Sequence, residues 1–190
     1  MRFLICAGLA VLLLGRAGGE HKMAEDRRRS ADGSQQLVLE KDQGEHRIRR
    51  PREKPVPANS FIMKFDRNNG GSQHLVLGTE LIPPGGIIPL HHHLGQDEIL
   101  LIRTSTAHIW LGDHESDVHA GAVVLIPSGT WIRLKNTGKE DLDLAFVFSG
   151  PGFDDYLRCT SVPEGQPATV MTNEEWRGCQ HKGHAEFADT

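Results

Sequence analysis

Three side chains that could bind a metal lie close together in the segment "IIPLHHHLGQDEIL", residues 87–100. His91 and His93 are two residues apart, so on an extended chain their imidazoles project from one face and that of His92 from the other. Glu98 follows after a short turn, at the start of the next apolar run. Two imidazoles and one carboxylate suit Fe(II), Mn, Zn or Ni and leave coordination positions open. The alternative is a histidine-rich turn that water surrounds.

Strands must position these side chains, because short runs of β-branched and aromatic residues alternate with turn signals from residue 60 to residue 150. No helical periodicity lies between the runs, and this spacing is typical of an all-β sandwich or barrel. Alternation within one run puts Leu142, Leu144 and Phe146 on the same face. Since the inward residues are mainly Leu, Ile and Phe, we expect a cavity that is apolar apart from the metal-binding set.

Two segments of this region resemble the two sequence motifs of the cupin superfamily. The first motif, a glycine, then H-x-H, then a glutamate, is filled by Gly85, His91, His93 and Glu98. The second is filled by Gly121, Pro127, Gly129 and Asn136, within "GAVVLIPSGTWIRLKN". The resemblance, to small bacterial one-domain cupins, covers about residues 60–160. It implies an all-β fold, a jelly-roll β-barrel of the cupin type.

Two positions depart from these motifs. Ser105 stands where a glycine usually closes the first motif, and Ile132 stands where the second normally supplies a histidine as fourth metal ligand. An aliphatic side chain cannot bind a metal, so the usual four-ligand site is absent. Three interpretations remain open: His91, His93 and Glu98 hold a metal by themselves, the barrel binds a small molecule without metal, or the barrel is a structural module.

The resemblance implies several activities, since cupins include dioxygenases, isomerases, decarboxylases and non-enzymatic binders, and a fold does not choose among them. We consider two hypotheses: a metal-dependent, oxygenase-like enzyme, and a non-enzymatic protein that binds a small molecule without metal. Both predict a small-molecule ligand, and the resemblance also implies a homodimer. The formal net charge of −4 does not indicate a nucleic-acid-binding protein.

The N-terminus has the pattern of a secretory signal peptide in residues 1–17. Arg2 precedes an apolar run from Phe3 to Leu14, which is too short to cross a bilayer as a helix. Gly15 and Ala17 supply small residues at a cleavage site. An uncleaved anchor is the alternative. We expect a secreted or periplasmic protein that has no stable membrane span after cleavage.

The cysteines also fit the expectation that the protein is exported. Cleavage after residue 17 would remove Cys6 and leave Cys159 and Cys179. Two cysteines in an exported protein suggest a disulfide. The alternatives are two free thiols, or thiolate ligation of a metal near His181 and His184.

We divide the mature chain into three parts by composition. They are a charged, flexible N-terminal segment (18–58), a cupin barrel (59–158) and a C-terminal extension (159–190). The arginines from Arg47 to Arg52 are predicted to form a solvated face. In the extension, Thr172 and Glu175 match a capping box just before Trp176, which predicts a short helix.

Overall fold

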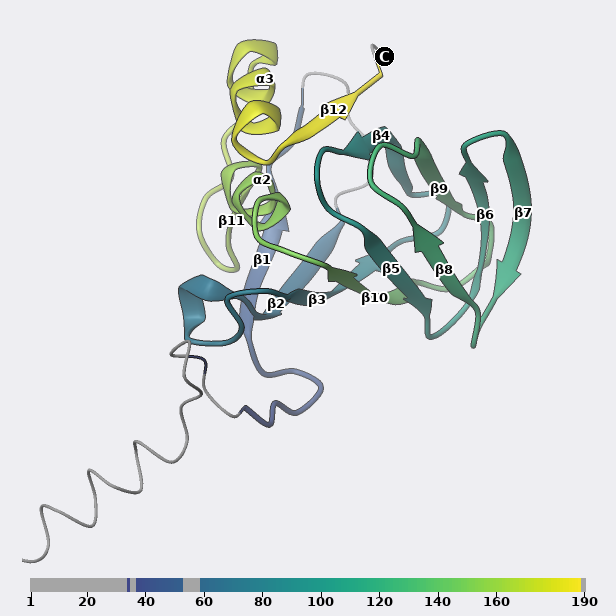
Figure 1. Ribbon diagram of the computed structural model, residues 1–190, viewed down its shortest axis with the longest axis horizontal. Helices are drawn as coiled ribbons and strands as arrows, with labels where there is room; N and C mark the ends of the chain where they lie inside the picture. Colours follow the sequence, from purple (N-terminus) through teal and green to yellow (C-terminus); the bar gives the residue numbers. More distant parts are fainter. Residues whose placement is uncertain (1–33, 35–36, 53–58, 189–190) are drawn as a thin grey trace, which may run out of the picture.

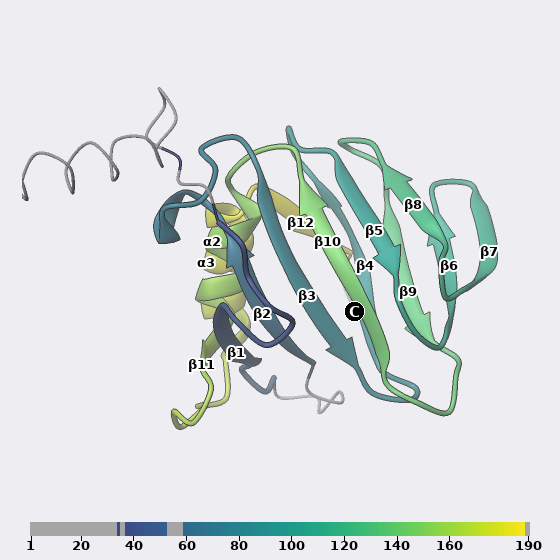
Figure 2. The same cartoon turned by 90° about the horizontal axis from the view of Figure 1, so that it is seen from below.

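The computed structural model describes residues 34, 37–52 and 59–188, and the predicted signal peptide, residues 1–17, lies outside these ranges. Most regular structure of the described residues consists of strands in two antiparallel sheets that face each other (Figures 1 and 2). The predicted all-β fold is therefore confirmed. Within the described ranges, no helix has the length and apolar character needed to cross a membrane.

The larger sheet has seven strands. In spatial order they are β11 (Ser161–Pro163), β1 (Glu45–Arg49), β2 (Ser60–Phe65), β3 (Val76–Ile82), β10 (Leu142–Phe148), β5 (Glu98–Ile102) and β8 (Val123–Ile126). The smaller sheet has five: β12 (Ala185–Phe187), β4 (Ile87–His93), β9 (Ile132–Asn136), β6 (Thr106–Leu111) and β7 (His114–His119). The chain passes repeatedly from one sheet to the other, as it must in a jelly-roll barrel.

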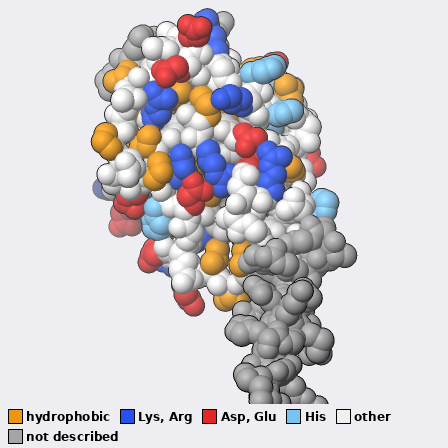
Figure 3. Space-filling view, turned by 90° about the vertical axis from the view of Figure 1, so that its left-hand side faces the viewer, with side chains coloured by type: hydrophobic (Ala, Val, Ile, Leu, Met, Phe, Trp, Pro, Cys, Tyr) orange, Lys and Arg blue, Asp and Glu red, His pale blue; other side chains and the backbone are white. Residues whose placement is uncertain are grey.

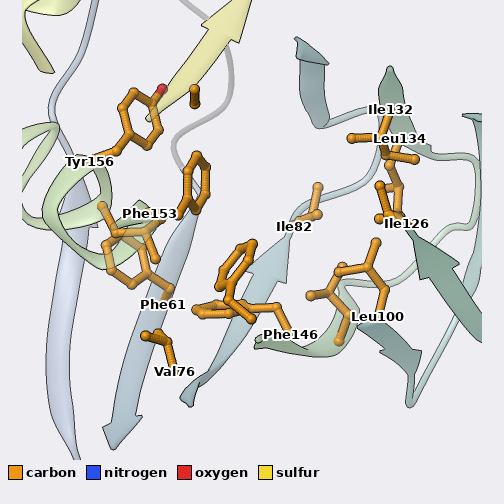
Figure 4. Packing of buried hydrophobic residues seen from close by; sticks show 14 of the residues in the cluster. Phe61, Val76, Ile82, Leu100, Ile126, Ile132, Leu134, Phe146, Phe153 and Tyr156 are labelled. Carbon is orange, nitrogen blue, oxygen red and sulfur yellow. The ribbon is translucent and has the colours of Figure 1, made fainter. Parts of the chain in front are cut away.

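The core lies between the two sheets. Leu142, Leu144, Phe146 and Phe148 alternate along β10 and are all buried, as the period of two predicts. Ile132 and Leu134 enter the same core from β9 of the opposite sheet (Figure 4). Burying each such side chain stabilises the fold by roughly 1.5–3 kcal/mol.

The motif residues other than the metal-binding set shape the turns of the barrel. Ser105 has φ +63°, in the left-handed region that glycine adopts without steric cost, which explains why the motif usually has glycine there. Asn136 joins two chain segments, because its Nδ2 donates hydrogen bonds of 2.8 Å to the carbonyls of Ile82 and Glu140. Its Oδ1 accepts from the backbone of Gly138 at 2.9 Å.

The strand pairing crosses both boundaries that we drew from composition. β1 lies inside the segment 18–58 that we expected to be flexible, and it pairs with β2 and β11. β11 and β12 come from the C-terminal extension and each adds a strand at a sheet edge. Composition hid β11 and β12, because their sequences, SVP and AEF, have only three residues. For β1, EHRIR, the sequence also allows a hairpin with the preceding residues QLVLE, but the strand pairs with β2 and β11.

The prediction of a solvated arginine face is wrong for Arg47. This side chain is buried, and its guanidinium donates to Ser161 Oγ at 2.6 Å and to the backbone carbonyls of Arg158 and Ser161. These partners satisfy its donors inside the protein. Arg50 is also only partly exposed, with 16% of its side chain accessible, and it pairs with exposed Glu175 at 3.3 Å. Figure 3 shows Lys and Arg side chains lying among Asp and Glu side chains on one face.

Two helices lie beside each other at one side of the barrel: α2 (Phe153–Cys159) and α3 (Asn173–Lys182) (Figure 1). The predicted capping box of α3 is present, since Thr172 Oγ1 accepts from the backbone of Glu175 at 3.1 Å and Glu175 Oε2 accepts from that of Thr172 at 2.8 Å. The predicted disulfide joins Cys159 to Cys179 and so connects the two helices. The sequence analysis did not predict α2, because Gly152 precedes it without a side-chain cap.

Candidate metal centre

His91, His93 and Glu98 come together where the chain passes from one sheet to the other. Both histidines lie at the end of β4, and Glu98 is the first residue of β5 in the opposite sheet. The three side chains are buried, with exposed fractions of 3%, 1% and 6%. Their ligand atoms all lie within 4.8 Å of one another, and His93 Nε2 is 3.1 Å from Glu98 Oε2. The histidines are therefore not in a wet turn.

The hydrogen bonds of the two imidazoles leave nitrogen atoms available. His91 Nδ1 lies 2.7 Å from the carbonyl oxygen of Pro89, which can only accept, so Nδ1 carries the proton and Nε2 offers a lone pair. His93 Nδ1 is buried and has no hydrogen-bond partner among the described residues. A metal at this site would bind His93 through Nε2, the nitrogen that faces Glu98 Oε2 at 3.1 Å.

The residues present fit a divalent metal. A metal holds nitrogen and oxygen ligands at about 2.0–2.2 Å, which places neighbouring ligand atoms roughly 3 Å apart. The separation of 3.1 Å between His93 and Glu98 already matches this spacing. A small rotation of the side chains would bring the ligand atoms that lie farthest apart, within 4.8 Å, to the same spacing. Two imidazoles and a carboxylate are also a donor set that Fe(II), Mn, Zn and Ni accept.

Burial controls the protonation of the three groups. Burial, together with a smaller effect of the neighbouring His93, lowers the pKa of His91 to about 4. It likewise lowers the pKa of His93 to about 4, with a contribution from His92. Burial also raises the pKa of Glu98 to about 7, which His91 partly opposes. At neutral pH both imidazoles are thus in the neutral form that binds metal.

The position of the usual fourth ligand is filled by an aliphatic side chain. The register of β4 against β9 places Ile132 directly opposite His91, so the two side chains share the inner face. Ile132 is only 1% exposed. The parity assigned from the sequence is confirmed, and an isoleucine methyl group stands where a fourth imidazole would point.

Aromatic rings from the C-terminal part of the chain enclose the histidines. His91 stacks with Phe153 of α2 at 5.8 Å and with Phe187 of β12 at 4.9 Å between ring centroids. His93 makes edge contacts with Phe148 at 5.0 Å and with Phe153 at 4.4 Å. β12 pairs directly with β4, with Phe187 opposite His91. These rings exclude water from the metal-binding set.

The turn between the histidines and Glu98 helps to hold this enclosure. Gln96 is 3% exposed, and its Nε2 donates to the carbonyl of Gly150 at 2.8 Å. Its Oε1 accepts from the backbone of Phe153 at 3.3 Å, which fixes the start of α2 over the imidazoles. The sequence analysis missed Gln96 and Phe153, because they contact each other over 57 positions of sequence and no local pattern pairs them.

His92 points away from the centre, as its parity predicts. Its ring packs against Trp131 at 4.3 Å, and its Nε2 lies 3.0 Å from exposed Glu186. Among the described residues, the sequence analysis also missed a second polar cluster, formed by the buried Asn59 and Glu80 and the partly exposed Arg49. These three residues are far apart in the sequence, so no local pattern brings them together.

Comparison with known proteins identifies the class of the barrel. Residues 78–148 match the family model of the cupin domain. This stretch runs from β3 to the end of β10 and includes the three metal-binding candidates. This segment therefore has the sequence of a cupin domain.

Two curated relatives share this region. The chain is 35% identical over 98 residues to mannose-1-phosphate guanylyltransferase 2 of Escherichia coli O157:H7, which covers 50% of this chain and 20% of that protein. It is 32% identical over 79 residues to mannose-1-phosphate guanylyltransferase of Sinorhizobium fredii, which covers 40% of this chain and 15% of that one. The chain thus spans a fifth or less of the length of these relatives.

Two solved structures show the same fold. One is a predicted oxalate decarboxylase of Thermotoga maritima, with a TM-score of 0.52, 22% identity, and coverage of 61% of this chain and 100% of that one. The other is described as a sugar phosphate isomerase of the cupin superfamily from Silicibacter pomeroyi, with a TM-score of 0.51, 18% identity, and coverage of 61% and 77%. At these identities the likeness concerns the fold alone.

Proposed function

We propose that the barrel binds one divalent metal through His91, His93 and Glu98 and uses the remaining coordination positions for a small-molecule ligand. The observation that carries this proposal is the meeting of three buried ligand groups, from two sheets, within 4.8 Å of one another. Two neutral imidazoles and a carboxylate have no comparable reason to share an apolar interior without a metal. Iron, manganese, zinc and nickel all suit the set.

The chain's own residues define what such a centre can do. A bound metal would polarise an oxygen atom of the ligand as a Lewis acid. Ile132 supplies no ligand atom, so the protein would contribute three ligands and the small molecule could take a remaining coordination position. Phe153 and Phe187 limit water around His91. This arrangement supports the metal-dependent enzyme of our first hypothesis, including an oxygenase-like one.

The relatives favour a hydroxylated ligand. Both curated proteins are named for an enzyme of mannose 1-phosphate. We therefore propose a carbohydrate-class ligand. The alternative, a non-enzymatic cupin that binds its ligand without metal, is favoured by a single observation, the aliphatic Ile132 in the fourth ligand position.

We also propose that the protein is exported and acts in an oxidising compartment, secreted or periplasmic. The disulfide between Cys159 and Cys179 supports this location, because disulfides persist outside the reducing cytosol. The homodimer expected from the resemblance stays a prediction.

Titration of the metal-free protein with Mn²⁺, Fe²⁺, Zn²⁺ and Ni²⁺ tests the proposal. We expect at least one of them to bind with a stoichiometry of one per chain and to raise the melting temperature, since it binds only the folded state. Glu98→Ala should abolish both effects. An unchanged melting temperature with all four metals would favour the metal-free alternative.

A further inference from the structure

A second polar cluster faces the barrel interior from β1, β2 and β3. Glu80 of β3 is 5% exposed, and the strand register places it between Phe61 and Leu144, two residues of the core. Its Oε1 accepts a hydrogen bond of 3.0 Å from Asn59 Nδ2 and lies 3.7 Å from Arg49 Nη2. The metal-binding set does not use any of these three groups.

One atom of the cluster has no partner. Asn59 Nδ2 donates to Glu80 Oε1 and also to the carbonyl of Ile87 at 3.4 Å, and both of these oxygens act as acceptors. These contacts fix the orientation of the amide, so its Oδ1 must be the other atom. Asn59 is 7% exposed, and Oδ1 is buried without a hydrogen-bond partner among the described residues. A buried acceptor of this kind favours a ligand that donates a hydrogen bond.

Packing contacts connect this cluster to the metal-binding set. The guanidinium of Arg49 lies 5.6 Å from the ring of Tyr156, and Tyr156 stacks with Phe153 at 4.9 Å. Phe153 in turn contacts His93 at 4.4 Å. Burial chiefly raises the pKa of Glu80, Arg49 and the hydrogen bond from Asn59 oppose the shift, and Glu98 adds to it by a smaller amount. The cluster and the metal-binding set therefore line one interior.

The charges and hydrogen-bonding groups define the ligand. Arg49 and Glu80 carry opposite charges, which disfavours a ligand with a net charge at this wall. Asn59 Oδ1 needs a donor, and the Arg49 guanidinium offers donors. A hydroxyl group both donates and accepts, so it matches the two together. The rings of Phe153 and Tyr156 provide flat apolar surfaces for carbon-bound hydrogens.

We propose that Arg49, Asn59 and Glu80 bind a hydroxyl group of a neutral sugar or polyol and so orient it beside the metal-binding set. This assignment rests on the proposed function, because it concerns the ligand of the same barrel interior. It adds to that function the residues that would recognise the ligand and the chemical class that they accept.

Calorimetric titration of the metal-loaded protein with D-mannose, D-mannitol and inorganic phosphate tests the assignment. We expect one or both neutral probes to bind more tightly than phosphate. Asn59→Ala should weaken that binding at least tenfold without loss of metal. Glu80→Gln, which keeps the shape and the acceptor for Asn59, should weaken it less. Ser60→Ala is the matched control, because Ser60 is the next residue on β2 and points to the opposite face.

The outcomes separate this assignment from the proposed function. Unchanged binding in folded, metal-loaded Asn59→Ala would overturn the assignment, and so would a wild type that prefers phosphate or binds neither neutral probe. A wild type that takes up no metal would overturn the proposed metal centre instead. Binding of mannose that depends on Asn59 in the metal-free protein would still support the hydroxyl-binding wall.

Discussion

The buried carboxyl of Glu98 makes the metal-free protein sensitive to pH. Its pKa is raised from 4.5 to about 7 because burial disfavours the charged form. Between these values the folded protein keeps the proton that the unfolded chain has released. Raising the pH through this window therefore lowers the free energy of unfolding, and the loss is complete above pH 7.

Glu98→Gln should remove this dependence, because glutamine stays neutral at every pH in the window. With a chelator present, the variant should gain stability over wild type between pH 5 and pH 8, by up to about 3 kcal/mol. Urea unfolding of both proteins at several pH values measures the difference. A stability difference that does not change with pH would show that the Glu98 carboxyl is ionised in the folded metal-free protein.

Ile132→His should restore a fourth metal ligand, because residue 132 lies opposite His91 on the inner face. Without metal the buried ring lacks a partner, and the variant should be less stable than wild type by roughly 1–3 kcal/mol. Added Zn²⁺, Mn²⁺ or Ni²⁺ should raise its melting temperature more than that of wild type, since a fourth nitrogen strengthens binding. Equal increases in the two proteins would mean that residue 132 does not face the metal.

At the scale of single residues, the alternation of side chains along one strand predicts which of them face inward. The alternation of His91, His92 and His93 assigns the inner and outer faces correctly, because it depends only on the geometry of one strand. Glu80 and Arg49 could not be predicted in the same way. Their partners lie on other strands, and one sequence does not reveal which strands become neighbours.

At the scale of elements, the two helices and β12 form the wall that encloses His91. The disulfide joins α2, which carries Phe153, to α3, which leads into β12 and Phe187. Trp176 of α3 also donates from Nε1 to the hydroxyl of Tyr156 at 3.3 Å. The position of each ring therefore depends on the other helix.

Replacing both Cys159 and Cys179 with serine should lower the free energy of unfolding by about 3 kcal/mol, on the loop-entropy model for a loop of this length. The cysteines are 20 residues apart. The double variant also avoids a free thiol. Urea unfolding of wild type, with and without reductant, provides the comparison. If reductant leaves the stability of wild type unchanged and two thiols can be alkylated, the disulfide is absent from the purified protein.

The elements differ in how well the sequence predicts them. The capping box predicts α3, and apolar alternation predicts β10, because both signals are local and strong. β12 has only three residues, and it forms because it pairs with β4. β1 is largely charged, yet Arg47 is buried through contacts with residues more than a hundred positions away. Tertiary contacts position both strands, so no local pattern predicts β12 or the burial of Arg47.

At the scale of the whole molecule, the two cupin motifs predict the fold because their order and spacing constrain the strands that form the barrel. Export is the prediction that belongs to this scale. Expression in a cell that processes secretory proteins should yield a mature chain that begins at residue 18. Intact-mass measurement checks this, and a product that retains residues 1–17 would support the uncleaved anchor.

Elemental analysis of the purified protein tests the central claim most directly. Wild type and His92→Ala should each contain close to one equivalent of iron, manganese, zinc or nickel per chain, because His92 points away from the centre. His93→Ala should contain almost none while it keeps the circular dichroism spectrum of the folded barrel. An absence of metal from wild type, or equal metal loss in His92→Ala and His93→Ala, would contradict the proposed metal centre.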